Sequence, residues 1–251
     1  MFTNKRISQP ESKYIDKTMV IEKENTLSKT AVIFGMGPGI GAAAAREFAA
    51  LGYQLALVAR SESKLEYFVA EFKADGLTAK AFVADASNGK SIDAAVRDIR
   101  IWSGGDPSVV LFNAFTSQPA GWTHKVEPAA FARSLLVNAG AAQHLAYHFA
   151  PALLAAGEGS LLFTGNGFAL TPRGHGFGTL SAGKSAMRSV ALTLAEDRAG
   201  SGVRVGLLTV NGPIGRGTAF DPDVIATEFV KLHQGTVTDT EIVYNGAVRF
   251  S

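Results

Sequence analysis

Four glycines in the stretch 32–43 restrict the folds open to this chain more than any other feature of its sequence. The stretch reads VIFGMGPGIGAA, so an apolar, β-prone segment over 30–34 runs through the glycines into an alanine-rich helical segment over 42–51. The first N–H groups of a helix attract phosphate, and glycines let phosphate approach the backbone closely. A strand, a glycine loop and a helix in this order predict a dinucleotide site, and a tight turn without a ligand is the alternative.

Strand-like and helix-like segments alternate along the rest of the chain. Further buried strands are predicted over 54–59, 78–84, 108–112, 160–164, 203–210 and 241–244. Helices are predicted from 61, from 87 or 88 through 102, and over 127–156, 181–199 and 222–233. This alternation predicts an α/β fold with a doubly wound parallel sheet in a single domain over 30–251. A polar, flexible arm is expected over 1–29, where charged and hydroxylated residues dominate.

Composition excludes several classes of function. Of the 251 residues, 47% are hydrophobic, which is enough for a sizeable core, and the net charge of +2 argues against a nucleic-acid partner. The chain has no cysteine, which excludes disulfides, thiolate metal sites and thiol catalysis. No apolar run is long enough for a signal peptide or a membrane span, so we expect a cytoplasmic protein without a membrane partner.

Residues that follow the predicted strands are candidates for ligand binding, because ligands of such sheets gather beyond the carboxyl ends of the strands. Arg60 follows the second strand, where an NAD-preferring site places an acid for the ribose 2′-hydroxyl. An arginine there pairs with a 2′-phosphate, which favours NADP(H) over NAD(H), or it packs over the next helix. Asp85 and Ala86 follow the third strand, and Asp85 either accepts a hydrogen bond from an adenine amino group or caps the next helix.

These motifs resemble the short-chain dehydrogenases/reductases. The spacing of Gly35, Gly39 and Gly41 is similar to the family's T-G-x-x-x-G-x-G loop, and FNAF at 112–115 is similar to its N-N-A-G motif. NGPI at 211–214 resembles the P-G-x-I stretch that meets the nicotinamide carboxamide. The resemblance implies a Rossmann fold. The cofactor-binding residues that it implies are Gly35, Gly37, Gly39, Ile40, Gly41, Arg60, Asp85, Ala86, Asn113, Ala114, Lys184, Gly212 and Ile214.

The catalytic motif departs from the family. Members carry Y-x-x-x-K, in which a cationic lysine lowers the tyrosine pKa so that the hydroxyl exchanges a proton with substrate. The matching segment here is LSAGK at 180–184, so the resemblance places Leu180 at the tyrosine position and retains Lys184. The family's helix asparagine matches Asn138, and its helper serine falls at Gly167, next to Asn166.

Substitute proton donors come from the neighbouring residues. The candidates are a water, Lys184, Asn166 and His175. The amide of Asn166 can hydrogen-bond a substrate carbonyl, and the imidazole of His175 titrates near neutrality. The alternative for His175 is an exposed position in a loop. His144 and His148 have the spacing of a metal pair on one helix face, but no third ligand accompanies them in the sequence, so no metal is predicted.

The predicted function is an NADP(H)-dependent oxidoreductase that transfers hydride to or from a small carbonyl, alcohol or enone substrate through a non-standard proton donor. The alternative is a catalytically inactive NADP(H)-binding sensor or structural protein. An S-adenosylmethionine methyltransferase is disfavoured, because such enzymes usually place an acid where Arg60 stands. The resemblance further implies a homodimer or homotetramer and a substrate lid over 215–234, where Phe220 and Phe229 line an apolar pocket or belong to the core.

Overall fold

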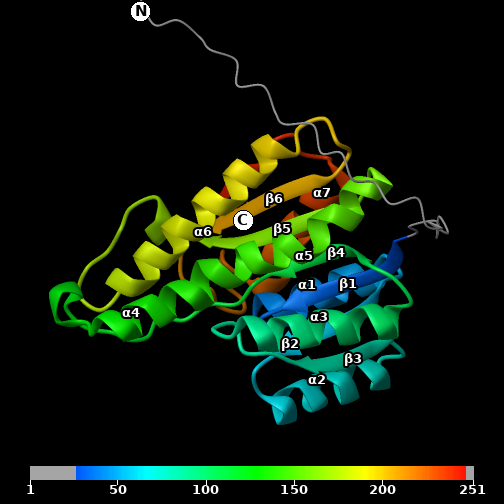
Figure 1. Cartoon of the computed structure of the whole chain (residues 1–251), viewed down its shortest axis with the longest axis horizontal. Coiled ribbons are helices and arrows are strands. Elements are labelled where there is room, and N and C mark those ends of the chain that lie inside the picture. Colours follow the sequence, from blue (N-terminus) through cyan, green and yellow to red (C-terminus); the bar gives the residue numbers. More distant parts are fainter. Residues whose placement is uncertain (1–26, 247–251) are drawn as a thin grey trace, which may run out of the picture.

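Seven parallel strands form one sheet in the computed structural model, which describes residues 27–246 of the protein (Figure 1). The strand order is β3-β2-β1-β4-β5-β6-β7, so the chain starts mid-sheet, winds outwards to β3 and returns to begin the second half at β4. The strands are β1 (Ser28–Phe34), β2 (Gln54–Ala59), β3 (Ala79–Val83), β4 (Pro107–Phe112), β5 (Ser160–Asn166), β6 (Arg204–Val210) and β7 (Glu241–Tyr244).

Helices cover both faces of the sheet, because successive strand residues point to opposite faces and a parallel sheet must bury both. On β1, Val32 and Phe34 pack towards α3, α5 and α6, which lie in front in Figure 1, whereas Ala31 and Ile33 pack towards α1, α2 and α7. These helices are α1 (Ile40–Ala50), α2 (Glu62–Ala74), α3 (Gly89–Ser103), α5 (Ala141–Ala156), α6 (Gly178–Asp197) and α7 (Pro222–Gln234).

The helical tract predicted over 127–156 has an irregular centre. α4 (Pro128–Leu135) begins after Glu127, whose side chain accepts a hydrogen bond from the Ala130 amide at 2.9 Å. A π-helical turn (Leu136–Gly140) then links α4 to α5. Such turns contain an extra residue and often occur at functional sites, and this one carries Asn138.

The sequence-based prediction of a single doubly wound α/β domain is confirmed, with element boundaries shifted by a few residues. Residues 1–26 of the predicted arm lie outside the described residues, and Ser28 already belongs to β1. Within 27–246, no helix is long and apolar enough to cross a membrane.

The segment 215–234 contributes more to the core than the predicted lid would. α7 packs against α1 and β6, and Phe229 is fully buried between them, so of the two alternatives for this residue the core position holds. Phe220 lies over Gly212, where a side chain would collide with its ring, and it contacts the Tyr244 ring at 5.7 Å between centroids. Both phenylalanines therefore pack within the fold.

Candidate functional site

A cavity of about 700 Å³ lies at the carboxyl edge of the sheet, between the glycine loop after β1 and the ends of β2, β4 and β5. β1 pairs with both β2 and β4, so the cavity stands where the strand order reverses, the usual ligand position in such sheets. The predicted site residues that line it are Gly35, Gly37, Gly39, Ile40, Gly41, Arg60, Ala86, Asn113, Ala114, Asn166, Leu180, Lys184 and Ile214. Asp85, Asn138, His175 and Gly212 do not belong to its lining.

The backbone of Gly35 is pressed against the loop that follows β4. Its φ of +102° lies in the region that glycine tolerates, and a Cβ there would collide with the backbone of Ala114. The Asn113 side chain donates a 2.9 Å hydrogen bond from Nδ2 to the Gly35 carbonyl. The glycine loop is therefore held in place by the end of the neighbouring strand.

Gly37 and Gly39 provide the open face of the loop. A Cβ built at either residue meets no atom within 4 Å, and both residues line the cavity. Gly39 is the N-cap of α1 and has no side chain to cap the helix, so the positive end of α1 faces the cavity through bare backbone. This space fits the pyrophosphate of a dinucleotide, which binds N–H groups at a helix N-terminus.

Two cationic side chains stand at one end of the cavity. Arg60 follows β2, and Lys64 lies one turn further on, at the start of α2; both line the cavity together with Ser61. In the described part of the chain, no carboxylate lies within 4.0 Å of either cationic group. Their charges are therefore available to an anionic group of a ligand.

The carboxylate of Asp85 is used mainly for local structure. Its Oδ1 accepts hydrogen bonds from the Ser87 amide and from the Ser87 hydroxyl, both at 2.8 Å, and its Oδ2 lies 3.6 Å from the Arg133 guanidinium. The backbone hydrogen bond from Ser87, its hydroxyl, and the charges of Arg133 and Arg60 together lower the Asp85 pKa against a smaller effect of burial. Ala86, rather than Asp85, reaches the cavity wall.

Lys184 is connected to the glycine loop by a chain of hydrogen bonds. Its Nζ donates to the Thr164 carbonyl at 2.8 Å, and the Thr164 hydroxyl donates to Asn113 Oδ1 at 2.9 Å. Asn113 in turn donates to the carbonyl of Gly35. The lysine end of the cavity and the glycine loop are thus joined through the ends of β4 and β5.

The Lys184 ammonium is unusually buried for a cation. The residue is 3% exposed, and burial lowers the pKa of its ammonium to about 8. The Phe112 ring lies 6.0 Å from Nζ, and no ion pair in the described chain includes this lysine. A buried group with such a shift in a cavity wall is a candidate for proton transfer.

Leu180 precedes Lys184 by one turn of α6 and presents an apolar side chain to the same cavity. Asn166 also lines the cavity, but its Oδ1 accepts a 2.8 Å hydrogen bond from the Phe168 amide, which leaves its amide nitrogen as the group for a ligand. Beside it, a Cβ at Gly167 would collide with the side chain of Asn211. The side chain of Asn211 therefore fills the space next to Gly167.

Asn138 is fully buried and supports the loop after β4. Its Oδ1 accepts from the Thr116 amide and its Nδ2 donates to the Thr116 carbonyl, both at 2.9 Å, with a further 3.3 Å contact to Ser134 Oγ. These bonds use both ends of the side-chain amide, so Asn138 acts on the site by holding the loop. The π-turn places its side chain towards Thr116.

His175 is exposed and lies apart from the cavity lining. Its φ is +51°, and its ring packs edge-on against Trp122 at 4.7 Å between centroids. The structure therefore does not bring His175 together with Lys184 and Asn166 in the cavity wall.

Sequence reasoning missed several residues that line the cavity. Lys64 could have been found, because it follows Arg60 by one helical turn and a helix was predicted there. Phe115 belongs to the FNAF segment at 112–115 but was not named as a site residue. Val137 comes from the π-turn and follows no strand, so the search beyond the strand ends did not find it.

A doubly wound sheet with a bare glycine loop at its switch point defines a dinucleotide-binding α/β protein. The family profile of the short chain dehydrogenases matches residues 29–214, and the chain belongs to this family of nicotinamide-dependent oxidoreductases.

Relatives with curated names support this assignment. A 2,3-dihydro-2,3-dihydroxybenzoate dehydrogenase of Bacillus subtilis (strain 168) is 30% identical over 145 residues, covering 58% of this chain and 55% of the relative. A tropinone reductase homolog of Arabidopsis thaliana is 28% identical over 177 residues, covering 70% of this chain and 65% of the relative. The chain thus spans less than two thirds of the length of these relatives.

Solved structures match over most of their length. A metagenomic short-chain oxidoreductase in complex with NADP has a TM-score of 0.78 and 27% identity, covering 88% of this chain and 99% of that one. A short-chain dehydrogenase from Rhodopseudomonas palustris has a TM-score of 0.74 and 25% identity, covering 85% and 96% of the two chains.

Proposed function

We propose that this chain binds NADP(H) in the cavity and transfers hydride between it and a small carbonyl, alcohol or enone substrate. The observation that carries the proposal is the Lys184 ammonium, buried in the cavity wall with its pKa lowered to about 8. Membership of the short-chain dehydrogenase family supports the reaction class, and the NADP complex of a similar oxidoreductase supports the cofactor.

Lys184 is the proposed proton donor, acting directly or through a water, in place of the tyrosine that the family pattern puts at position 180. NADP(H), when bound, supplies or accepts the hydride. The Thr164 carbonyl holds Nζ at the cavity wall, and a pKa near the working pH suits proton transfer in both directions. Leu180 supplies an apolar wall beside Lys184, and the amide nitrogen of Asn166 orients the substrate oxygen.

The test is the pH dependence of carbonyl reduction, followed by NADPH absorbance over a panel of carbonyl and enone substrates. Reduction requires protonated Lys184, so kcat/KM should fall as pH rises through about 8. Lys184→Arg keeps a cation that does not titrate in this range and should remove that fall, with kcat reduced more than KM is raised. A pH profile that persists unchanged in Lys184→Arg would rule out this proton donor.

The preference for NADP(H) rests on the charges of Arg60 and Lys64, neither of which has a carboxylate within 4.0 Å among residues 27–246. Replacing both by alanine should weaken NADPH binding by about a hundredfold and leave NADH binding within a few fold, because only NADPH carries the 2′-phosphate. Arg97→Ala, an exposed arginine on α3 outside the cavity lining, is the matched control. Equal losses for both nucleotides would mean that the two residues act on the fold instead.

Leu180 supports a second candidate function, a catalytically inactive NADP(H)-binding sensor or structural protein. A leucine at the cavity wall has no proton to exchange, and position 167 offers no hydroxyl. The two functions differ in turnover. Steady NADPH consumption with any substrate of the panel excludes the second, whereas tight NADPH binding without turnover favours it.

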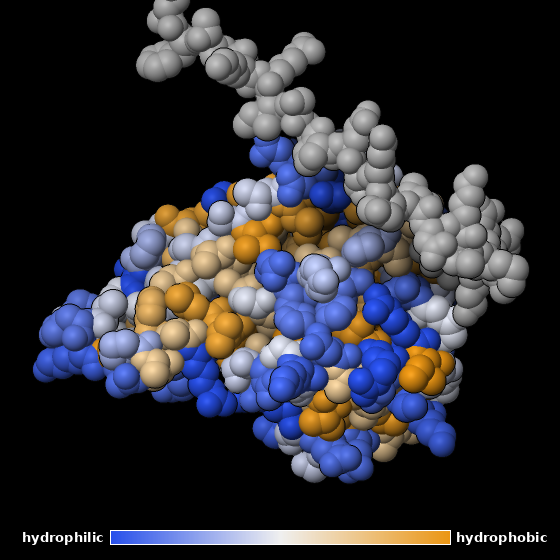
Figure 2. Space-filling model, viewed as in Figure 1, coloured by the Kyte–Doolittle hydropathy of each residue, from blue (hydrophilic) through white to orange (hydrophobic). Residues whose placement is uncertain are grey.

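Assembly into a homodimer or homotetramer is a further part of the proposal. Figure 2 shows apolar residues gathered over α6, and partly buried apolar side chains there include Ala186, Leu192 and Ala195. Leu136 and Tyr147, on the π-turn and on α5, are 50% and 71% exposed. Light scattering at working concentration should give a multiple of the chain mass, and a monomeric mass would contradict this expectation.

A further inference from the structure

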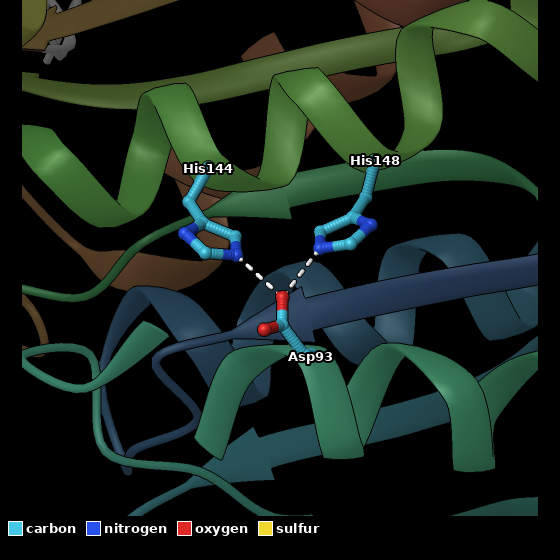
Figure 3. Close-up of side chains that lie close together, drawn as sticks. All are labelled: Asp93, His144 and His148. Carbon is cyan, nitrogen blue, oxygen red and sulfur yellow. Dashed lines mark hydrogen bonds and ion pairs between the residues drawn. The ribbon is translucent and has the colours of Figure 1, made fainter. Parts of the chain in front are cut away.

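Two histidines and one aspartate converge on a point between α3 and α5, away from the cavity. His144 Nε2 and His148 Nε2 lie 2.7 and 2.8 Å from the same oxygen, Oδ1 of Asp93 (Figure 3). Ligand atoms of all three side chains lie within 4.8 Å of one another. None of the three residues lines the cavity, so this cluster is separate from the site described above.

The cluster has the composition of a transition-metal site. Imidazole nitrogen and carboxylate oxygen are common Zn²⁺ ligands, and histidines four residues apart on a helix present both rings to one side. A tetrahedral ion with bonds of about 2.0–2.1 Å would separate its ligand atoms by about 3.3 Å. Each ring would then move away from Asp93 by about 0.5 Å, and the two ring nitrogens, which lie within 4.8 Å of one another, would also have to reach this separation.

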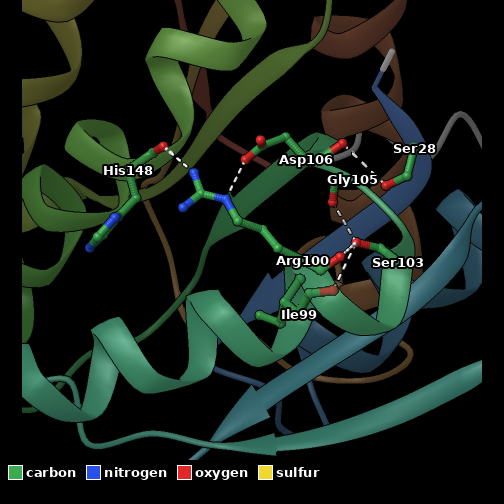
Figure 4. A network of polar contacts seen from close by, with 7 residues as sticks. All are labelled: Ser28, Ile99, Arg100, Ser103, Gly105, Asp106 and His148. Atoms are coloured by element: carbon green, nitrogen blue, oxygen red, sulfur yellow. Dashed lines mark hydrogen bonds and ion pairs between the residues drawn. The ribbon is translucent and has the colours of Figure 1, made fainter. Parts of the chain in front are cut away.

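The backbone around the cluster is held in place independently of these side chains. Arg100 reaches from α3 to α5 and donates from Nη2 to the carbonyl of His148 at 2.7 Å, while its Nε donates to Asp106 Oδ1 at 2.7 Å (Figure 4). Gly89, the first residue of α3, lies under the His144 ring, where a Cβ would come within 3.0 Å of Cε1. The fold thus leaves room for the His144 ring and positions the His148 backbone.

The cluster is open enough for an ion to enter. The side chain of Asp93 is 51% exposed, that of His144 29% and that of His148 19%. Three protein ligands at a partly exposed site leave further coordination positions to water.

We propose that Asp93, His144 and His148 bind one divalent transition-metal ion, with Zn²⁺ as the probe, and that the ion links α3 to α5. The two nitrogen donors select Zn²⁺, Co²⁺ or Ni²⁺ over Mg²⁺ and Ca²⁺, which prefer all-oxygen sites. The ion would act separately from the cavity, because none of its three ligands belongs to the cavity lining.

The test uses the full, tag-free chain, in which the other histidines are His124, His175 and His233 and there is no cysteine. Calorimetric titration should give one Zn²⁺ per chain, and Zn²⁺ at about one hundred times its Kd should raise Tm by about 5–10 °C, whereas Mg²⁺ should not. Asp93→Asn, His144→Gln and His148→Gln should each weaken zinc binding at least tenfold. The control is His124→Gln combined with His175→Gln, which removes exposed imidazoles elsewhere and should leave binding unchanged.

A second measurement needs no variant. Zinc should protect His144 and His148 of the unmodified protein from diethyl pyrocarbonate, read by peptide mass spectrometry, while His124 and His175 remain reactive. The proposal is overturned by the absence of zinc binding, by binding that survives the three site variants, or by protection confined to other histidines. In any of these outcomes the cluster is a hydrogen-bonded contact between two helices.

Discussion

Replacing Lys184 by methionine should stabilise the protein at neutral pH, although the change removes a hydrogen bond. Burial lowers the lysine pKa from 10.5 to about 8, and this difference corresponds to a cost of about 3 kcal/mol for keeping the ammonium charged in the folded state. Methionine fills a similar volume without charge. Loss of the hydrogen bond to Thr164 offsets about 1 kcal/mol. The net gain at pH 7 is therefore about 2 kcal/mol.

The pH dependence of this gain identifies its cause. Between about pH 8 and 10.5 the unfolded chain still holds the lysine proton while the folded chain releases it, so the unfolded state binds more protons. Stability of the native protein therefore rises with pH across this window, whereas the variant lacks this contribution. The advantage of Lys184→Met should shrink from pH 8 upwards and disappear near pH 10.

The assay is thermal unfolding of cofactor-free protein from pH 7 to pH 10, where a 2 kcal/mol gain corresponds to a Tm increase of about 4–8 °C. Lys90→Met, at an exposed position on α3, is the matched control and should change Tm little at any pH. A variant less stable than the native chain at pH 7, or a difference that does not vary with pH, would refute the reasoning.

Leu180→Tyr should introduce or raise carbonyl reduction, measured as NADPH consumption, because it puts a hydroxyl one turn from Lys184. If the variant binds NADPH but its activity does not change, the catalytic defect extends beyond position 180. Gly37→Val should abolish NADPH binding in fluorescence titrations with Tm almost unchanged, since its side chain enters open space. Gly35→Ala should instead lower Tm by several degrees, because its φ is +102° and its Cβ meets the Ala114 backbone. Asn138→Ala should lower the free energy of unfolding in urea by about 3 kcal/mol, because it leaves the partly buried N–H and C=O groups of Thr116 without these partners; a loss below 1 kcal/mol would contradict this.

The parts of the fold that depend on local pattern could be predicted from the sequence. Apolar segments that alternate with helix-forming segments predict a parallel sheet. Ligands of such sheets gather beyond the carboxyl ends of the strands, which points to residues such as Arg60 and Asn113, and both line the cavity. The burial of Lys184, by contrast, was not predicted, and it arises because α6 packs against β5 and β6.

Features that depend on packing between distant segments could not be predicted. Asp93 meets His148 across 55 positions of sequence, and nothing in the spacing of either helix indicates that they pack side by side. The π-turn over 136–140 contains no proline that would mark an irregularity. His175 lies in the loop before α6, and this loop brings its ring against Trp122. Its nearness to Lys184 in sequence therefore does not indicate that the two side chains lie together.

The contact between Gly167 and Asn211 constrains how this cavity could change in evolution. A Cβ at position 167 would collide with the Asn211 side chain and lie 3.1 Å from its Cα, so a serine there requires the Asn211 side chain to move. Shortening residue 211 first removes the nearest obstacle. The size of the side chain at 167 and the size of the side chain at 211 are therefore coupled, and we expect these two positions to change together.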